Sequence, residues 1–345
     1  MDKTPIPGRA PEPILEVQGL TVDIASEAGS FPVVRSLDLA LFPGETLGLV
    51  GESGSGKTLT CLSLTRLLPS PPARYQSGRV LFQGNDLWQM DEPALTRIRG
   101  RHIAMIFQEA QSALNPVLTA GEQVREVLSR HFGLPEAEGR RRVLALFSQV
   151  GISDPERRYH QYPHQLSGGL QQRVMIAMAL AGEPEVLIAD EPTTALDVTI
   201  QAQILELIQQ IQRQRQMSVL FVTHDLGVVA ELCNRVLVLY AGREVESGPV
   251  EQIFREPRHP YTRMLLDTVP DLSKPRGRFQ PIPGQVPSPA YLPGGCAFHP
   301  RCPEADDTCR RLEPPIETLS PGRRVSCWRR MEDRTLAPAA GRTES

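Results

Sequence analysis

The chain has 345 residues, enough at roughly 150 per domain for about two domains, and 40% of them are apolar, so a sizeable core can form. Lys and Arg number 37 against 40 Asp and Glu, a net charge of −3, which excludes a partner bound through bulk charge, such as nucleic acid or anionic lipid. The apolar runs are shorter than the roughly 20 residues of a membrane helix, so we expect the chain to stay in the cytoplasm.

The prolines divide the chain into a folded body and two flanks. Of 32 prolines, 15 lie from Pro257 onward and four lie within the first 13 residues. Dense proline disfavours helices and central strands. We therefore expect a flexible N-terminal tail over 1–13, a folded body over 14–256, a loop-rich C-terminal extension over 257–330 and a disordered tail over 331–345.

Within the body, short apolar strand patterns alternate with longer helical ones, which is typical of a layered α/β fold. The expected strands are 14–22, 36–41, 46–50, 103–107, 186–189, 219–222 and 235–240. The expected helices are 57–68, 124–132, 140–150, 169–181 and 200–213.

A glycine-rich motif follows the strand at 46–50 and precedes the helix at 57–68. It reads Gly51-Glu52-Ser53-Gly54-Ser55-Gly56-Lys57-Thr58 and fits the phosphate-binding pattern G-x-x-x-x-G-K-[ST]. Its backbone N–H groups and the helix N-terminus attract phosphates, Lys57 reaches the β- and γ-phosphates, and the Thr58 hydroxyl can bind Mg²⁺. The motif predicts a nucleoside triphosphate site.

Polar residues at the ends of three other strands fit the same site. Asp190 and Glu191 end the apolar strand 186–189, where Asp190 can bind Mg²⁺ and Glu191 can orient or deprotonate the attacking water. His224 follows the strand 219–222 and can contact the γ-phosphate as a neutral imidazole. Gln108 follows the strand 103–107 and can contact Mg²⁺ or water.

With these motifs the sequence resembles the ATP-binding subunits of ABC transporters. Leu166-Ser167-Gly168-Gly169-Leu170-Gln171 resembles the signature motif of that superfamily. Ser167 and the amides of Gly168 and Gly169 lie at a helix N-terminus, which favours an anion. The resemblance implies a P-loop NTPase fold with a mixed sheet and a helical subdomain over about 109–182. It also implies that the signature binds the ATP held by a second ATP-binding subunit, and that Ala195, Leu196 and Asp197 form a loop communicating between the two sites.

The extension narrows the resemblance to the oligopeptide and dipeptide importer branch. The supporting segments are Asn115-Pro116, His259-Pro260-Tyr261-Thr262, Ile282-Pro283-Gly284 and the stretch from Gly295 to Pro303. The resemblance implies a peripheral protein at the cytoplasmic face of the inner membrane that hydrolyses ATP to drive uptake. It also implies two permease subunits, a second and different ATP-binding subunit, and a solute-binding protein. The branch includes nickel and glutathione importers, so these cargoes stay open.

Four cysteines lie in the extension, namely Cys296, Cys302, Cys309 and Cys327. A reducing cytoplasm disfavours disulfides, which leaves a metal centre or free thiols. The spacing lacks the C-x2-C pairs usual for zinc, and a [4Fe–4S] cluster also takes four cysteines. Members of this branch that resemble the chain in these cysteines can carry such a cluster, which we expect here over zinc or free thiols.

Two further questions stay open at this point. The family usually stacks adenine on an aromatic side chain, which would lie here near Asp23 or Ile24, where none stands; Phe31 or an aliphatic side chain is the alternative. A soluble ATPase acting on nucleic acid or the ribosome is the alternative function, although the chain lacks a basic surface, a long coiled-coil insertion and a second ATPase half.

Overall fold

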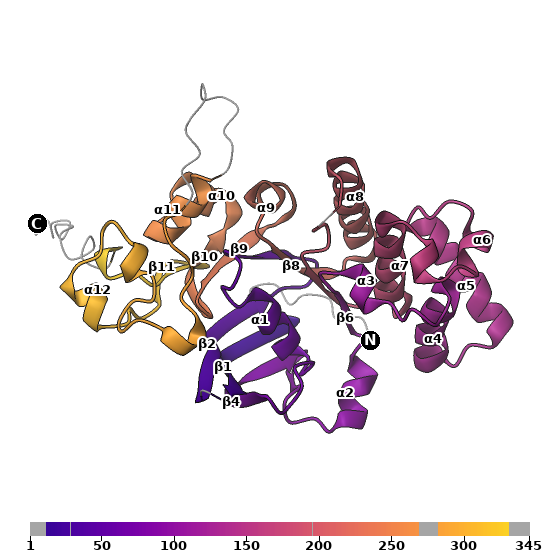
Figure 1. Ribbon diagram of the computed structural model, residues 1–345, viewed down its shortest axis with the longest axis horizontal. Coiled ribbons are helices and arrows are strands. Elements are labelled where there is room, and N and C mark those ends of the chain that lie inside the picture. The colour runs from indigo at the N-terminus through magenta and orange to yellow at the C-terminus, as the bar shows by residue number, and fades with distance from the viewer. Residues whose placement is uncertain (1–11, 28, 195, 269–281, 331–345) are drawn as a thin grey trace, which may run out of the picture.

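The computed structural model of the protein describes residues 12–27, 29–194, 196–268 and 282–330, arranged around two sheets (Figure 1). In these ranges, no helix has the length and apolar character needed to span a bilayer. The predicted tails 1–13 and 331–345 lie almost wholly outside the described residues.

An eight-stranded sheet forms the centre of the molecule, with the strand order β11-β12-β10-β9-β3-β8-β7-β6. Its strands are β3 (Thr46–Val50), β6 (Ile103–Ile106), β7 (Val186–Asp190), β8 (Ser218–Thr223), β9 (Arg235–Tyr240), β10 (Arg243–Pro249), β11 (Glu317–Ser320) and β12 (Arg323–Val325). Strands β9, β3, β8, β7 and β6 run parallel, so their carboxyl ends share one edge. Strands β3, β7 and β8 are buried throughout, as expected from continuous apolar runs.

A smaller antiparallel sheet has the order β2-β1-β4-β5. It contains β1 (Leu15–Ser26), β2 (Gly29–Leu41), β4 (Ala73–Phe82) and β5 (Asn85–Asp86). Helix α1 (Lys57–Leu64) packs Cys61 and Leu64 into a core shared with both sheets, and α2 (Glu92–Ile98) follows β5. The apolar pattern of the sequence did not predict β4, because the middle of this strand, around Gln76 to Arg79, is exposed and lacks alternating apolar residues.

The helical subdomain lies at the opposite end of the main sheet from the extension (Figure 1). It comprises α3 (Ala110–Ala113), α4 (Ala120–Phe132), α5 (Glu136–Gln149), α6 (Pro155–Tyr159), the 3₁₀ turn η1 (Pro163–Gln165) and α7 (Gly168–Ala181). Thr119 and Glu122 form a capping box at the start of α4, and Gly133 ends it with a left-handed φ of 62°. Next come α8 (Val198–Arg215), whose apolar face is buried, and α9 (Leu226–Leu232).

The extension is continuous with the body. The body ends with α10 (Val250–Arg255), and the extension adds α11 (Pro260–Leu266), the 3₁₀ turns η2 (Pro289–Tyr291) and η3 (His299–Arg301), and α12 (Asp307–Arg311). Strand β12 pairs with β10, which the sequence analysis did not predict. Tyr261 and Phe298 pack edge-on against Tyr240 of β9, with ring centroids 4.7 and 5.2 Å away. The proline-rich extension is therefore held in place by aromatic side chains that pack against the ATPase body.

Candidate functional site

The phosphate-binding loop joins the carboxyl end of β3 to α1, as the motif predicts. A Cβ on Gly51 would lie 2.3 Å from the Leu239 carbonyl oxygen, and one on Gly56 would lie 2.9 Å from that of Val33. Gly56 also has a φ of 101°, which favours glycine. Glycine is therefore required at these two positions by the close approach of neighbouring strands.

Lys57, at the start of α1, folds back onto this loop. Its Nζ donates to the carbonyl oxygens of Gly51 (2.8 Å) and Glu52 (3.1 Å). Burial lowers the pKa of Lys57, while the carboxylates of Glu191 and Asp190 oppose the shift. The ammonium thus lies in the loop that phosphates would enter, and its hydrogen bonds to the Gly51 and Glu52 carbonyl oxygens are the contacts that a phosphate would replace.

Asp190, the last residue of β7, has the character of a cation ligand. Its side chain is almost completely buried, and Oδ1 has no hydrogen-bond partner within the described residues. Burial raises the pKa of Asp190, although a hydrogen bond with Thr58 opposes the shift. An unpartnered buried carboxylate oxygen beside a hydroxyl is an oxygen donor set that suits Mg²⁺. Asp190 and Thr58 therefore fit the predicted magnesium role.

Glu191 lies at the centre of a polar cluster. Its Oε2 accepts hydrogen bonds from Gln108 Nε2 (3.3 Å) and Thr194 Oγ1 (2.9 Å) and lies 3.3 Å from His224 Nδ1. Its Oε1 lies 3.7 Å from Lys57 Nζ. The structure thus brings together the residues that the sequence analysis placed after four separate strands. Thr194 was missed, because a hydroxyl three residues after a carboxylate is too common a pattern to single out.

A cavity of about 830 Å³ opens beside this cluster. The body lines it with Gly51, Glu52, Ser53, Gln108, Glu191 and His224. The extension lines it with Leu265, Thr268, Ile282, Gly284, Gln285 and Val286. The predicted catalytic residues Gln108, Glu191 and His224 thus form one wall of the cavity. The C-terminal extension, which carries no predicted catalytic residue, forms the other.

The signature residues lie elsewhere. Ser167 is exposed at the N-cap of α7, where its hydroxyl accepts no hydrogen bond from the helix N–H groups, and Gly168 and Gly169 begin that helix. Asp197 is exposed before α8. None of these four lines the 830 Å³ cavity, and Ala195 falls outside the described residues. Within one chain, the signature and the phosphate-binding loop are separate.

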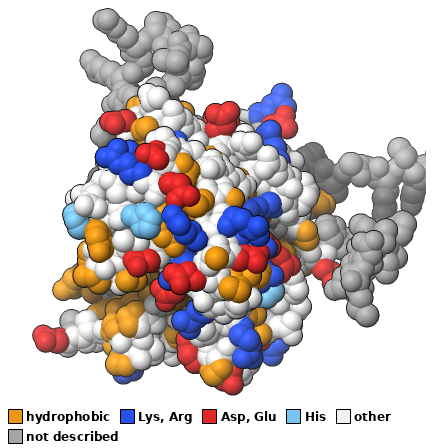
Figure 2. All heavy atoms as spheres, turned by 90° about the vertical axis from the view of Figure 1, so that its right-hand side faces the viewer, with side chains coloured by type: hydrophobic (Ala, Val, Ile, Leu, Met, Phe, Trp, Pro, Cys, Tyr) orange, Lys and Arg blue, Asp and Glu red, His pale blue; other side chains and the backbone are white. Residues whose placement is uncertain are grey.

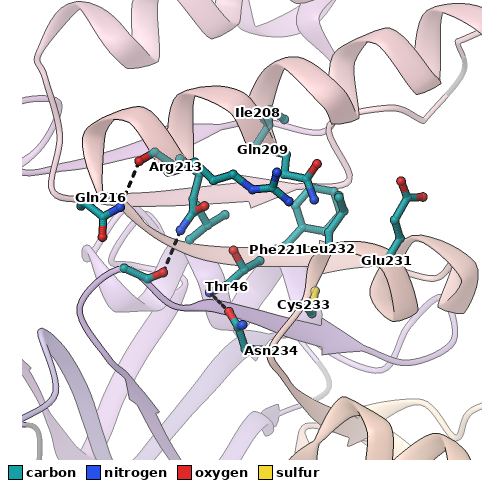
Figure 3. A pocket seen from close by; sticks show the side chains of 13 residues that line it. Thr46, Ile208, Gln209, Arg213, Gln216, Phe221, Glu231, Leu232, Cys233 and Asn234 are labelled. Atoms are coloured by element: carbon teal, nitrogen blue, oxygen red, sulfur yellow. Dashed lines mark hydrogen bonds between the residues drawn. The ribbon is translucent and has the colours of Figure 1, made fainter.

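A second cavity, of about 340 Å³, lies between the second half of α8, the end of α9 and the amino ends of β3 and β8 (Figure 3). Gln212 donates to the Gly44 carbonyl, and Asn234 accepts from the Thr46 amide. None of the predicted site residues lines it. We place the candidate site at the larger cavity, because Glu191, Gln108 and His224 line it.

The four extension cysteines are close enough to influence one another. Burial first, and the neighbouring thiols next, raise the pKa of Cys296 to about 12 and that of Cys302 to about 11. The Cys296 amide donates to the Cys309 carbonyl (2.8 Å). However, the described residues include no group of three or more His, Cys, Asp or Glu arranged to hold a metal ion. The expected metal centre is thus not shown.

The hairpin of β1 and β2 places Phe31 directly opposite Ile24. Phe31 and Ile24 are therefore neighbours on the small sheet, and the adenine contact stays a prediction.

Comparison with known proteins gives two family matches. Residues 34–194 match the family described as ABC transporter, and residues 245–309 match the oligopeptide/dipeptide transporter C-terminal region. A Brucella abortus (strain 2308) protein described as a peptide import ATP-binding protein is 49% identical over 315 residues, 91% of this chain and 94% of its own length. One from Brucella ovis, with the same description, is 49% identical over 332 residues, 93% and 98% of the two chains.

Solved structures agree with these matches. An ATP-binding cassette solved as a dimer in a post-hydrolysis state with ADP and Pi is 28% identical, with a TM-score of 0.62 over 68% of this chain and 98% of that one. The cbiO1 protein of Clostridium perfringens, part of the ABC transporter complex cbiONQ, is 27% identical, with a TM-score of 0.60 over 71% and 92%. From the identity with the Brucella proteins and the two family matches, the chain belongs to the ATP-binding proteins of ABC transporters, in their oligopeptide and dipeptide branch.

Proposed function

We propose that the chain hydrolyses ATP to drive an inner-membrane importer of dipeptides and oligopeptides, and that it acts at the cytoplasmic face. The observation that carries the proposal is the position of Glu191, held by Gln108, Thr194 and His224 within reach of Lys57. A carboxylate fixed by hydrogen bonds beside a phosphate cradle is placed to orient or deprotonate a water molecule.

The other residues of the phosphate-binding site bind the phosphates and Mg²⁺. Lys57 exchanges its contacts with the Gly51 and Glu52 carbonyls for the β- and γ-phosphates, and the loop amides hold the phosphates through Ser53 to Thr58. Thr58, Asp190 and Gln108 would hold Mg²⁺, which when bound neutralises charge on the phosphates. His224, largely exposed, is free to turn toward the γ-phosphate.

The proposed partners follow from the exposed signature. Because Ser167, Gly168 and Gly169 lie away from the cavity of their own chain, they are available to the nucleotide of a second ATP-binding subunit, and Asp197 to signalling between the two sites. Two such sites closing over ATP and opening after hydrolysis would give a two-state motion. Each nucleotide state shifts that equilibrium only through the contacts it makes differently with the two conformations.

The segment 113–125 is the proposed contact with a permease subunit. It follows Gln108, and Gln123, itself buried, donates to the carbonyls of Asn115 and Leu118, which fixes the loop to α4. Val117 nevertheless exposes 75% of its surface. Figure 2 shows the face of the helical subdomain with charges of both signs interspersed with apolar side chains, which suits a protein partner better than a polyanion.

Reconstitution of the assembled transporter in proteoliposomes tests this function. We expect ATP turnover to require two permease subunits and to rise when a peptide-loaded solute-binding protein is added. Uptake of labelled nickel or glutathione without peptide uptake would show that the importer carries a different substrate. The proposed role of this chain as the ATP-hydrolysing subunit would still hold. Nucleic-acid-stimulated turnover without a membrane partner would contradict the proposal.

We also propose that Cys296, Cys302, Cys309 and Cys327 hold a [4Fe–4S] cluster. The support is that the Cys296 amide donates to the Cys309 carbonyl (2.8 Å), and that the other three thiols all contribute to raising the pKa of Cys296, so the four lie in one region. A cubane binds each thiolate at a different iron, so its sulfurs need not converge on a single ion. Iron and acid-labile sulfide in anaerobically purified protein, lost in Cys309→Ser but kept in Cys61→Ser, would support it. Colourless protein with stoichiometric zinc would contradict it.

A further inference from the structure

Glu52, the second residue of the phosphate-binding loop, is held by the C-terminal extension. Its backbone N–H donates to Tyr261 Oη (2.8 Å). Its two carboxylate oxygens accept from the two terminal nitrogens of Arg301 at 2.7 and 2.9 Å, a bidentate pair that joins residues 249 positions apart. Main chain and side chain of one loop residue are thus both fixed by residues outside the ATPase body.

The Arg301 side chain is itself immobilised. Nε donates to the Pro283 carbonyl (2.7 Å), and the terminal nitrogens also donate to Tyr240 Oη (3.3 Å) and the Ile282 carbonyl (3.4 Å). Together with the two bonds to Glu52, these contacts use all five N–H donors of a guanidinium. The side chain is only 6% exposed, with the rings of Tyr240 and Phe298 beneath it. A lysine could not make this set of contacts.

The geometry has an electrostatic consequence for nucleotide binding. Glu52 lines the 830 Å³ cavity, so without a partner its carboxylate would repel the phosphates of ATP. Arg301 neutralises it and, through Ile282, holds the extension segment that lines the same cavity. Arg301 therefore neutralises the charge of Glu52 and also fixes the extension segment at Ile282. Both effects favour binding of an anion in the cavity.

We propose that Arg301 is a positioning residue for the nucleotide: the C-terminal extension holds the phosphate-binding loop through Glu52 and cancels its charge, so that ATP meets a preorganised and neutralised cradle. The proposal rests on the proposed function only in taking this loop as the ATP site. Preorganisation raises affinity because ordering is complete before the ligand arrives. The effect falls on binding, since Arg301 touches neither Glu191 nor Lys57 in any described contact.

Titration of the full-length chain with MgATP tests the proposal. We expect Arg301→Gln to weaken the Kd for ATP by about tenfold, the usual scale for losing a charge-assisted hydrogen-bonded pair. The double variant Glu52→Gln/Arg301→Gln should bind ATP more tightly than Arg301→Gln alone, because the stranded negative charge is gone. In the assembled transporter, KM should rise while kcat at saturating ATP stays within about twofold.

The matched control is Glu313→Gln, which breaks another ion pair between the extension and the body. Glu313 contacts Arg35 and Arg243 and does not line the cavity, so its loss should leave the Kd for ATP unchanged. Tyr261→Phe keeps the buried ring and removes only the hydrogen bond to the Glu52 amide, so it tests the same contact if Arg301→Gln fails to fold. We expect it to weaken ATP binding by about threefold.

A wild-type Kd in both Arg301→Gln and Tyr261→Phe would overturn the proposal. So would a double variant no tighter than Arg301→Gln, or a Glu313→Gln variant that weakens binding equally, because these results would assign the effect to general loosening of the extension. Lys57→Ala separates the two proposals. If it also binds ATP normally, then the loop is not the nucleotide site and the proposed function itself fails.

Discussion

Replacing Glu191 by glutamine is the sharpest test of the catalytic cluster. The amide oxygen can still accept from Gln108 and Thr194, so the side chain should keep its position. What is lost is the negative charge 3.7 Å from Lys57 and the ability to take a proton from water. Removing this carboxylate relieves repulsion with buried Asp190 but also removes a charge partner of Lys57, so the two effects oppose each other in thermal stability.

A positioned general base contributes about 100- to 10,000-fold to a rate, equivalent to about 3–5 kcal/mol of barrier. We therefore expect Glu191→Gln to reduce ATP turnover of the assembled transporter by at least about 100-fold, with ATP affinity retained and ATP-bound, two-subunit closed complexes accumulating. A phosphate-release assay gives turnover, and size-exclusion chromatography with MgATP gives the closed form.

Glu185 provides the matched control, because it immediately precedes the strand that Glu191 follows. It contacts Gln83 and His102 at the opposite edge of the sheet, away from the cavity. Glu185→Gln should leave turnover within about twofold of wild type, the range expected for a partly exposed surface contact. Unaltered turnover in Glu191→Gln would refute the role of this carboxylate, and equal losses in both variants would point to a general effect on β7.

Three further predictions concern binding and pH. Lys57→Ala should abolish measurable MgATP binding by isothermal titration, because the buried ammonium is the cation of the cradle; binding within about twofold of wild type would contradict this. Burial raises the pKa of Asp190 above its usual 3.8, so the folded state favours the neutral carboxyl group. The protein therefore loses stability as pH rises through the raised pKa and this group becomes charged. Asp190→Asn should therefore unfold at a higher temperature than wild type at pH 7 without Mg²⁺, by about 2–4 °C per kcal/mol relieved, and should lose the Mg²⁺-dependent increase. Burial lowers the pKa of His259 from 6.5 to about 3, so its contribution to stability is present above pH 6.5 and falls by up to about 1.4 kcal/mol per pH unit as pH drops toward 3. His259→Asn keeps an acceptor for the Tyr261 amide at the start of α11 and should flatten thermal-unfolding profiles between pH 6.5 and 4, whereas parallel profiles would rule out this histidine.

The sequence by itself determined most of the nucleotide site. Gly51 to Thr58 form one contiguous motif whose flanking strand and helix were evident from apolar patterning. Asp190 ends one buried strand, and His224 and Gln108 follow two others; because parallel strands end at one edge, the order of elements predicts that these residues converge. The limits of β3 and β9 match the predicted ranges, because a continuous apolar run in a buried parallel strand has clear ends.

Only the tertiary structure decided how the C-terminal extension relates to that site. Its prolines predicted loops, and nothing local indicates that β12 adds to the main sheet or that Phe298 packs on Tyr240. The pair of Glu52 and Arg301 spans 249 positions, a contact that periodicity and motif spacing cannot reveal. Local patterns specify elements and the groups they carry, whereas long-range contacts depend on which surfaces meet once the core has formed.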